Sequence, residues 1–139
     1  MQTVWTNIQL ALTALGGWLG WLFGGFDGLA LALVVFVSID YITGLMVAFI
    51  KKKLSSEIGA KGIFKKILIF VLVGIGHIID SQVLGGGSAI RTAVIFFYLS
   101  NEGISILENV AFIGVPIPEK LKAVLEQLRA GGRHDNEPK

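Results

Sequence analysis

Long stretches without charged residues constrain this chain more than any other feature. No charged residue occurs from Ile8 to Phe26, a run of 19 residues, and Asp40 is the one charge between Leu29 and Ile50. About 20 apolar residues in a helix cross the roughly 30 Å hydrocarbon core of a bilayer. The 139-residue chain is 53% hydrophobic and 16% charged, whereas a soluble domain carries about 25% charge. These patterns predict a small membrane protein and disfavour a soluble enzyme, a disordered chain and a collagen-like fibre.

The apolar stretches predict an all-α membrane protein with four transmembrane helices, which form one transmembrane domain over residues 1–117. The spans are expected at about 8–26, 29–50, 63–84 and 89–112. No Lys or Arg precedes the first span, which argues against a cleaved signal peptide, because such a peptide begins with a basic region. The fourth span is the weakest by hydropathy, because Arg91, Glu102 and Glu108 lie within it.

The basic residues are distributed unevenly, and their distribution predicts the orientation. Six lysines lie between the end of the second span and the first turn of the third, five basic residues follow the fourth span, and Arg91 alone falls on the opposite side. Because Lys and Arg mark the cytoplasmic side of membrane proteins, we expect this loop and both termini to be cytoplasmic. The same rule explains the basic loop, so no nucleic-acid partner is expected. The lysines of the loop are Lys51, Lys52, Lys53, Lys61, Lys65 and Lys66.

A short amphipathic helix is predicted over residues 118–130. Pro118 suits the first position of a helix, and apolar residues follow at helical spacing. Gly131 and Gly132 are expected to end it, with residues 131–139 disordered. Two placements stay open: the helix lies on the inner membrane surface or on a neighbouring subunit, or it packs against the basic loop. The apolar residues are Leu121, Val124, Leu125 and Leu128.

Polar residues gather on one face of the fourth span. A carboxylate at the centre of a membrane helix costs on the order of 3 kcal/mol, so Glu102 should face a partner helix, another subunit or water. In one interpretation this face makes contacts between helices, with Glu102 and Asn101 paired to Tyr41, Thr43 or His77. In the other interpretation it faces a water-filled lumen once subunits assemble. The members of the face are Tyr98, Asn101, Glu102, Ser105, Glu108 and Asn109.

Small residues recur at four-residue spacing on two other spans, where they let helix backbones approach closely. The approach can serve packing within one chain or between subunits. The chain has no cysteine and shows no phosphate loop, hydrolase triad or metal motif, so neither an enzyme nor a cofactor is expected. His77 and Asp80 are expected to share a structural hydrogen bond. The proposed packing residues are Gly16, Gly20 and Gly24 on the first span, and Asp40, Gly44 and Ala48 on the second.

Four segments together carry a resemblance to a known family. They are Asp40 to Gly44, Lys52 to Ser56, Asn101 to Asn109 and Gly114 to Pro118. This ordered set resembles the phage holin family that also includes the toxin-secretion holins of clostridia. The resemblance covers about residues 40–128, and the run from Asn101 with the following Pro-x-Pro element is its most specific part.

The resemblance implies a function that hydropathy does not. Holins collect in the bacterial cytoplasmic membrane, oligomerise and open lesions that release an endolysin or a large toxin and so trigger lysis. The expected partners are membrane lipid and further copies of the chain, with the endolysin or toxin as a functional partner that it need not touch. Two alternatives stay open, namely a small ion channel or transporter subunit, and an antiholin that delays lysis.

Overall fold

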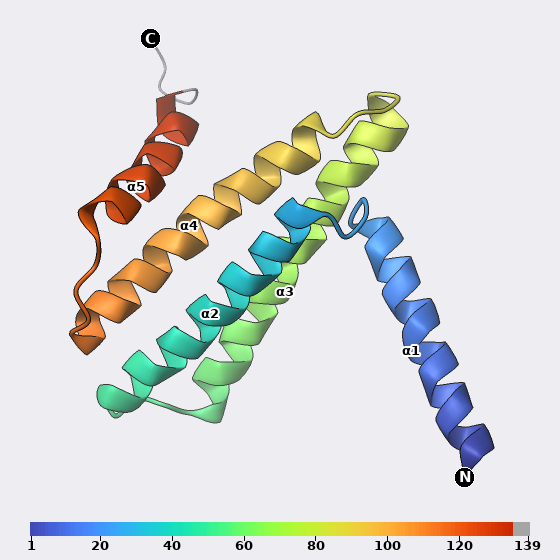
Figure 1. The fold of residues 1–139 in the computed structure, drawn as a ribbon, viewed down its shortest axis with the longest axis horizontal. Helices are drawn as coiled ribbons and strands as arrows, with labels where there is room; N and C mark the ends of the chain where they lie inside the picture. The colour runs from blue at the N-terminus through green and yellow to red at the C-terminus, as the bar shows by residue number, and fades with distance from the viewer. Residues whose placement is uncertain (135–139) are drawn as a thin grey trace.

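The structure, a computed structural model, describes residues 1–134, with side chains as far as residue 128. All of the regular secondary structure in this part is helical. The predicted tail over residues 131–139 lies largely outside this part. This part has five α-helices, of which the third continues into a π-helical turn, and Figure 1 shows how they are arranged. They are α1 (Gln2–Leu22), α2 (Gly28–Ile50), α3 (Ser56–Ile78) with η1 (Ile79–Val83), α4 (Ala89–Ile113) and α5 (Glu119–His134).

Three of these helical segments are long and apolar enough to cross a membrane. They are α2 with 23 residues, Ser56–Val83 with 28 residues and α4 with 25 residues. The predicted all-α membrane class is confirmed at this level. α1 has 21 uncharged residues but is not among the three, because polar residues such as Asn7 and Gln9 lower its mean hydropathy. A fourth span therefore stays a prediction.

α2, α3 and α4 form the packed part of the molecule (Figure 1). Two buried residues from each helix make its core: Leu33 and Val37, Ile69 and Val73, and Ile95 and Leu99. α1 extends away from these helices in Figure 1 and has no buried residue. α5 turns back from the end of α4 and lies beside it. The core therefore positions side chains of α2, α3 and α4 against one another.

Polar side chains fix where two of the core helices begin. The Asp27 carboxylate accepts from the Ala30 amide at 2.9 Å and caps α2. The Ser55 hydroxyl accepts from the Ile58 amide at 3.2 Å and caps α3. These caps satisfy amides that the first helical turn leaves free. Because α3 starts at Ser56, Lys61 also belongs to this helix, which corrects the predicted start of the third span at about residue 63.

The ends of α1 and α5 differ from the sequence-based expectations. α1 ends at Leu22, and Gly24 follows in a turn with φ +82°, close to His77 and Arg91. Gly16, Gly20 and Gly24 therefore do not share a helix face, which corrects that part of the prediction. α5 continues through Gly131 and Gly132 to His134. Glycine disfavours a helix by about 1 kcal/mol per residue, and the two glycines do not end this one.

Candidate functional site

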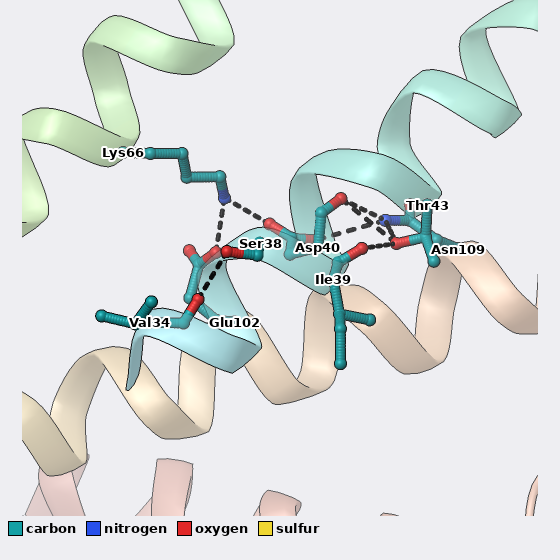
Figure 2. A network of polar contacts seen from close by, with 8 residues as sticks. All are labelled: Val34, Ser38, Ile39, Asp40, Thr43, Lys66, Glu102 and Asn109. Atoms are coloured by element: carbon teal, nitrogen blue, oxygen red, sulfur yellow. Dashed lines mark hydrogen bonds and ion pairs between the residues drawn. The ribbon is translucent and has the colours of Figure 1, made fainter. Parts of the chain in front are cut away.

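One lysine joins two carboxylates from different helices inside the packed part of the molecule. The Lys66 ammonium group of α3 donates to Oδ2 of Asp40 on α2 and to Oε2 of Glu102 on α4. Figure 2 shows the ammonium nitrogen between the two carboxylates. The exposed fractions of the side chains are 20% for Lys66, 8% for Asp40 and 10% for Glu102. We call these three residues the ion triad.

The ion triad lies at a single level of the three helices. Asp40 is ten residues from the end of α2, Lys66 is ten residues from the start of α3, and Glu102 is eleven residues from the end of α4. At 1.5 Å per residue each lies about 15 Å from the same end of the bundle. This distance is about half of a 30 Å hydrocarbon core. If the three helices cross a membrane, the ion triad lies inside the bundle at the level of the exposed Lys65, nearer to the α2–α3 connection than to the far end of the segment Ser56–Val83.

Two further polar residues extend the ion triad along α2 and α4. The Asn109 side-chain amide donates to Oδ1 of Asp40 at 3.1 Å and to Oγ1 of Thr43 at 3.0 Å. The Thr43 hydroxyl in turn donates to the Ile39 carbonyl at 2.8 Å. Figure 2 shows Asp40 between Lys66 on one side and Asn109 on the other. Asp40 therefore contacts both of the other helices, as Lys66 does.

The charges of the ion triad do not cancel when both carboxylates are ionised. One ammonium group then faces two carboxylates, which leaves one negative charge in excess. Buried ion pairs gain little net stability, because the cost of removing the charges from water offsets their attraction, whereas losing one partner is costly. The ion triad therefore specifies how the three helices pack, and its excess charge favours contact with water whenever the helices separate.

The residues of the predicted polar face on α4 have different environments. Glu102 is buried, Asn109 is half-buried and Glu108 is exposed. Glu102 pairs with Lys66, not with the expected Tyr41, Thr43 or His77, and Tyr41 instead donates to the Gly59 carbonyl at 3.0 Å. Three other members are half-buried, and Tyr98 among them packs against the core: Tyr98, Asn101 and Ser105.

The predicted packing residues also divide into two groups. Asp40 is buried on α2, and a Cβ at Gly44 would lie 3.8 Å from Nδ2 of Asn109 on α4. This side of α2, which Ala48 continues as a half-buried residue, thus faces α4. A Cβ atom added at Gly16 or at Gly20 would meet no atom within 4 Å. α1 therefore uses neither glycine for packing within the described chain.

The exposed lysines surround the end of the bundle nearest to the α2–α3 connection. Lys51, Lys52 and Lys53 are exposed, and so are Lys61 and Lys65. The Lys51 ammonium group lies 4.7 Å from the centre of the Phe112 ring, so α2 and α4 end side by side. Of the six lysines of the predicted basic loop, Lys66 alone points into the bundle.

A second polar cluster lies at the opposite end of the bundle, and the sequence analysis missed it. The buried Arg91 guanidinium donates to the Phe23 and Gly25 carbonyls and forms an ion pair with Asp27 at 2.9 Å. The Asp80 carboxylate accepts from the Ile90 and Arg91 amides at 2.9 and 2.8 Å, rather than from the expected His77. An arginine alone at the start of an apolar span was the signal that could have indicated this cluster.

The pKa of Asp27 reflects this second cluster. Hydrogen bonding to Arg91, together with the Ala30 amide bond, lowers the pKa of the Asp27 carboxyl below its usual value of 3.8. The carboxylate is thus ionised at neutral pH, and it stabilises the connection between α1 and α2 through Arg91. This cluster anchors the otherwise exposed α1 to the start of α4.

One large cleft of the described part has an almost entirely apolar lining. An open cleft of 690 Å³ lies between the end of α1 and the helices α2 and α3, and Ser38 is the one polar side chain in its lining. Ser38 donates its hydroxyl to the Val34 carbonyl of its own helix. Among the described residues, no group of three His, Cys, Asp or Glu side chains is arranged to hold a metal ion.

Three apolar helices of membrane length, connected by a buried ion triad, define the chain as a multi-pass membrane protein. Residues 17–130 match the bacteriophage holin family, which is most of the chain. The chain therefore belongs to the bacteriophage holin family, which confirms the resemblance seen in the sequence. Membership of this family indicates a membrane protein that is not an enzyme.

The chain is also similar to bacterial and phage proteins of about its own length. An uncharacterised 14.9 kDa protein of the nagH 3′ region of Clostridium perfringens is 43% identical over 128 residues, which cover 92% of this chain and 97% of that protein. An uncharacterised Listeria monocytogenes protein is 45% identical over 94% of this chain and 92% of its own length. A protein of Bacillus phage phi105 named "probable holin" is 40% identical over 70% and 71%. No solved structure matches the chain.

Proposed function

We propose that this protein is a holin, which oligomerises in the bacterial cytoplasmic membrane and opens lesions through which an endolysin reaches the cell wall. The observation that carries the proposal is the buried ion triad on three helices of membrane length, in a chain that belongs to the holin family. A relative named as a probable holin supports the same function. A large exported toxin is the other cargo that such lesions release.

The proposed topology has four spans, with α1 as the first. Both termini and the α2–α3 connection then lie in the cytoplasm, and the α3–α4 connection lies outside. Lys51, Lys52 and Lys53 support this orientation, because exposed basic residues favour the cytoplasmic side. Arg91, which lies on the outer side in this topology, is buried and paired with Asp27.

In the closed subunit, the ion triad holds α2, α3 and α4 together. While α2, α3 and α4 stay together, Lys66 holds Asp40 and Glu102 away from lipid. When subunits accumulate and their helices rearrange, the carboxylates gain access to water in a growing opening. Because charged groups are far more stable in water than in hydrocarbon, the rearranged state is stabilised by the same charges that the closed state shelters.

Inducing the gene in bacteria that hold an endolysin in their cytoplasm tests the proposal. We expect abrupt loss of the membrane potential, release of a cytoplasmic marker protein and lysis after a delay. Selective ion conduction in intact cells would instead indicate a channel or transporter subunit, and delayed lysis beside an active holin would indicate an antiholin. Either result contradicts the holin assignment.

The role of Glu102 is tested by timing lysis in the Glu102→Gln variant. The substitution keeps the Lys66–Asp40 pair and removes the excess negative charge, so we expect later lysis at an unchanged protein level. Glu57→Gln is the matched control, because Glu57 is an exposed residue in the first turn of α3. Unchanged timing of lysis in Glu102→Gln would exclude a role for this carboxylate in opening.

A further inference from the structure

The C-terminal helix α5 contacts α4 at one well-defined position. Leu125 of α5 is buried, with 7% of its surface exposed. A Cβ atom at Gly103 of α4 would lie 3.0 Å from both methyl groups of Leu125 and 3.2 Å from the ring of Phe36 on α2. Gly103 therefore leaves the space that Leu125 occupies, and α5 packs on α4 at a position next to Phe36 of α2.

This contact lies deep along α4. Gly103 is ten residues from Ile113, the end of α4, which corresponds to about 15 Å or half of the hydrocarbon thickness. α5 nevertheless carries charged residues along its length: Glu119, Lys120, Lys122 and Glu126. Each charged side chain costs on the order of 3 kcal/mol at the centre of a bilayer. A docked α5 therefore needs water or protein on its charged side.

The structure shows a cleft on that charged side. A cleft of 590 Å³ lies between the second half of α4 and α5. Its charged lining consists of Glu108 from α4 and three residues from α5, namely Glu119, Lys122 and Glu126. Glu108 is exposed, and water in the cleft would solvate its carboxylate. Three carboxylates and one ammonium group line the cleft, and such a charged lining suits a cleft filled with water.

The other side of α5 is apolar and also exposed. Leu121, Val124 and Leu128 expose 48%, 53% and 44% of their surfaces. At 100° per residue, these three side chains lie on one flank of Leu125, while Lys122 and Glu126 lie on the other. α5 thus presents its apolar flank and its charged flank to different surroundings, as expected of a helix at the boundary between water and an apolar phase.

We propose that α5 remains docked on α4 within the thickness of the membrane and that its charged flank, with Glu108, borders a water-filled cleft. The proposal rests on the proposed holin function in one respect: in an assembly of subunits, this cleft faces the lumen. It replaces the expectation that the C-terminal helix lies on the membrane surface. The kinked connection suits the docked position, because Gly114 has φ +107° and Pro116 and Pro118 prevent α4 from continuing into α5.

Paired cysteines test the docked position, and the chain has no cysteine of its own. In membranes treated with a mild oxidant, Gly103→Cys combined with Leu125→Cys should form a disulfide, so that most of the protein no longer binds a polyethylene-glycol maleimide. Phe36→Cys with Leu125→Cys repeats the measurement with Gly103 intact, using a short bifunctional thiol reagent. Gly103→Cys with Ala123→Cys is the matched control, because Ala123 is exposed. Failure of both Leu125 pairs to link would overturn the proposal.

The reactivity of single cysteines tests whether the cleft holds water. A charged, membrane-impermeant thiol reagent, added to both sides of membrane vesicles, should modify Glu126→Cys about as fast as Lys53→Cys in the exposed connection. Val124→Cys should react about tenfold more slowly, because apolar surroundings disfavour the reactive thiolate. Equal rates at residues 124 and 126 would overturn the proposal.

These measurements need neither endolysin nor lysis, so their outcome is separate from the holin assignment. Linked Leu125 pairs in a protein that releases no marker would leave the docked helix in place and contradict the holin function. Marker release by a protein whose Leu125 pairs do not link would support the holin function and contradict the docked helix.

Discussion

At the scale of single residues, Lys66 determines whether two carboxylates can share the interior of the bundle. It is the one cation that the structure places against Asp40 and Glu102 among the described side chains. Its neighbour Lys65 is exposed. Two lysines adjacent in sequence thus have opposite surroundings, which makes Lys65 a matched control for Lys66.

We predict that Lys66→Met lowers the free energy of unfolding by about 3–5 kcal/mol, the usual effect of leaving buried charges without a partner. Thermal or denaturant unfolding of the purified protein in detergent micelles measures this loss. Lys65→Met should change stability by less than about 0.5 kcal/mol, as most exposed substitutions do.

The triple variant Lys66→Met, Asp40→Asn, Glu102→Gln should recover most of that stability. It removes every charge of the ion triad and keeps side chains of similar volume, a change that is often neutral or stabilising. If the triple variant is as unstable as Lys66→Met, the loss comes from packing and not from unpaired charge.

A second residue-scale prediction concerns Asp27 and pH. The pKa of Asp27 is lowered in the folded protein, mainly by hydrogen bonding to Arg91, so folding is favoured by ionised Asp27. This contribution is fully present above about pH 4, the pKa of an unfolded Asp, and is lost as pH falls through the lower folded-state pKa. Asp27→Asn should therefore be less stable than the parent protein at pH 7 and equally stable near pH 2.

Melting temperatures in micelles between pH 2 and 7 measure this difference. Asn caps a helix about as well as Asp, so the substitution isolates the ion pair with Arg91. Glu57→Gln is again the control, since Glu57 is exposed and the structure shows no ion pair for it among the described residues. A difference between Asp27→Asn and the parent that persists at pH 2 would show that the cap, not the charge, matters.

At the scale of helices, the backbones of α3 and α4 approach each other closely where α4 begins. A Cβ atom at Gly76 would lie 3.1 Å from Cα and 3.2 Å from N of Arg91. Backbone atoms cannot move aside as a flexible side chain can. We therefore predict that Gly76→Ala destabilises the protein by about 1–3 kcal/mol, the usual range for overpacking, as measured by unfolding in micelles.

Gly20→Ala is the matched control for Gly76→Ala. A Cβ atom at Gly20 meets nothing within 4 Å, and alanine is the better helix former by about 1 kcal/mol. We expect unchanged or slightly raised stability for Gly20→Ala in the isolated chain. Loss of stability in Gly20→Ala would mean that α1 packs against a surface, such as another subunit, in the micelle.

Much of this helical architecture could be predicted from the sequence. The apolar stretch from Leu29 to Ile50, which contains only one charged residue, matches α2 to within one residue at its start. The reason is that a helix satisfies every backbone hydrogen bond of an apolar segment in a membrane. The start of α3 was harder to predict, since one acidic residue and three lysines lie in its first three turns. The Ser55 cap and the intrinsic helix preference of lysine explain why the helix includes them.

The candidate site could be predicted only in part. Asp40, Glu102 and Asn109 stood out, because a polar residue inside an apolar span needs a partner. Lys66 did not stand out, because a lysine near the end of a span usually extends toward water. Whether Lys66 extends toward water or points into the bundle depends on the rotation of α3 about its axis, and packing against α2 and α4 determines that rotation. For the same reason the pairing of Arg91 with Asp27, 64 residues apart, could not be predicted.

At the scale of the whole molecule, the two polar clusters divide the bundle into levels. The Arg91 cluster lies at the end where α1 meets α2 and α3 meets α4, and the ion triad lies between the two ends. The exposed lysines and Phe112 mark the other end. This order along the bundle axis fixes which connections lie together on one side of a membrane. Whether the chain has three spans or four then depends only on whether α1 crosses the membrane.

We predict four spans, and single cysteines at three surface positions test the count. The exposed positions Gln2, Lys53 and Ser88 lie at the start of α1, between α2 and α3, and before α4. In intact spheroplasts, an impermeant thiol reagent should modify Ser88→Cys and leave Gln2→Cys and Lys53→Cys unmodified until the membrane is permeabilised. The physical reason is that α1, with 21 uncharged residues or about 31 Å of helix, is long enough to cross. Modification of both Gln2→Cys and Ser88→Cys in intact spheroplasts would contradict this prediction, because α1 would then lie outside and α2, α3 and α4 alone would cross the membrane.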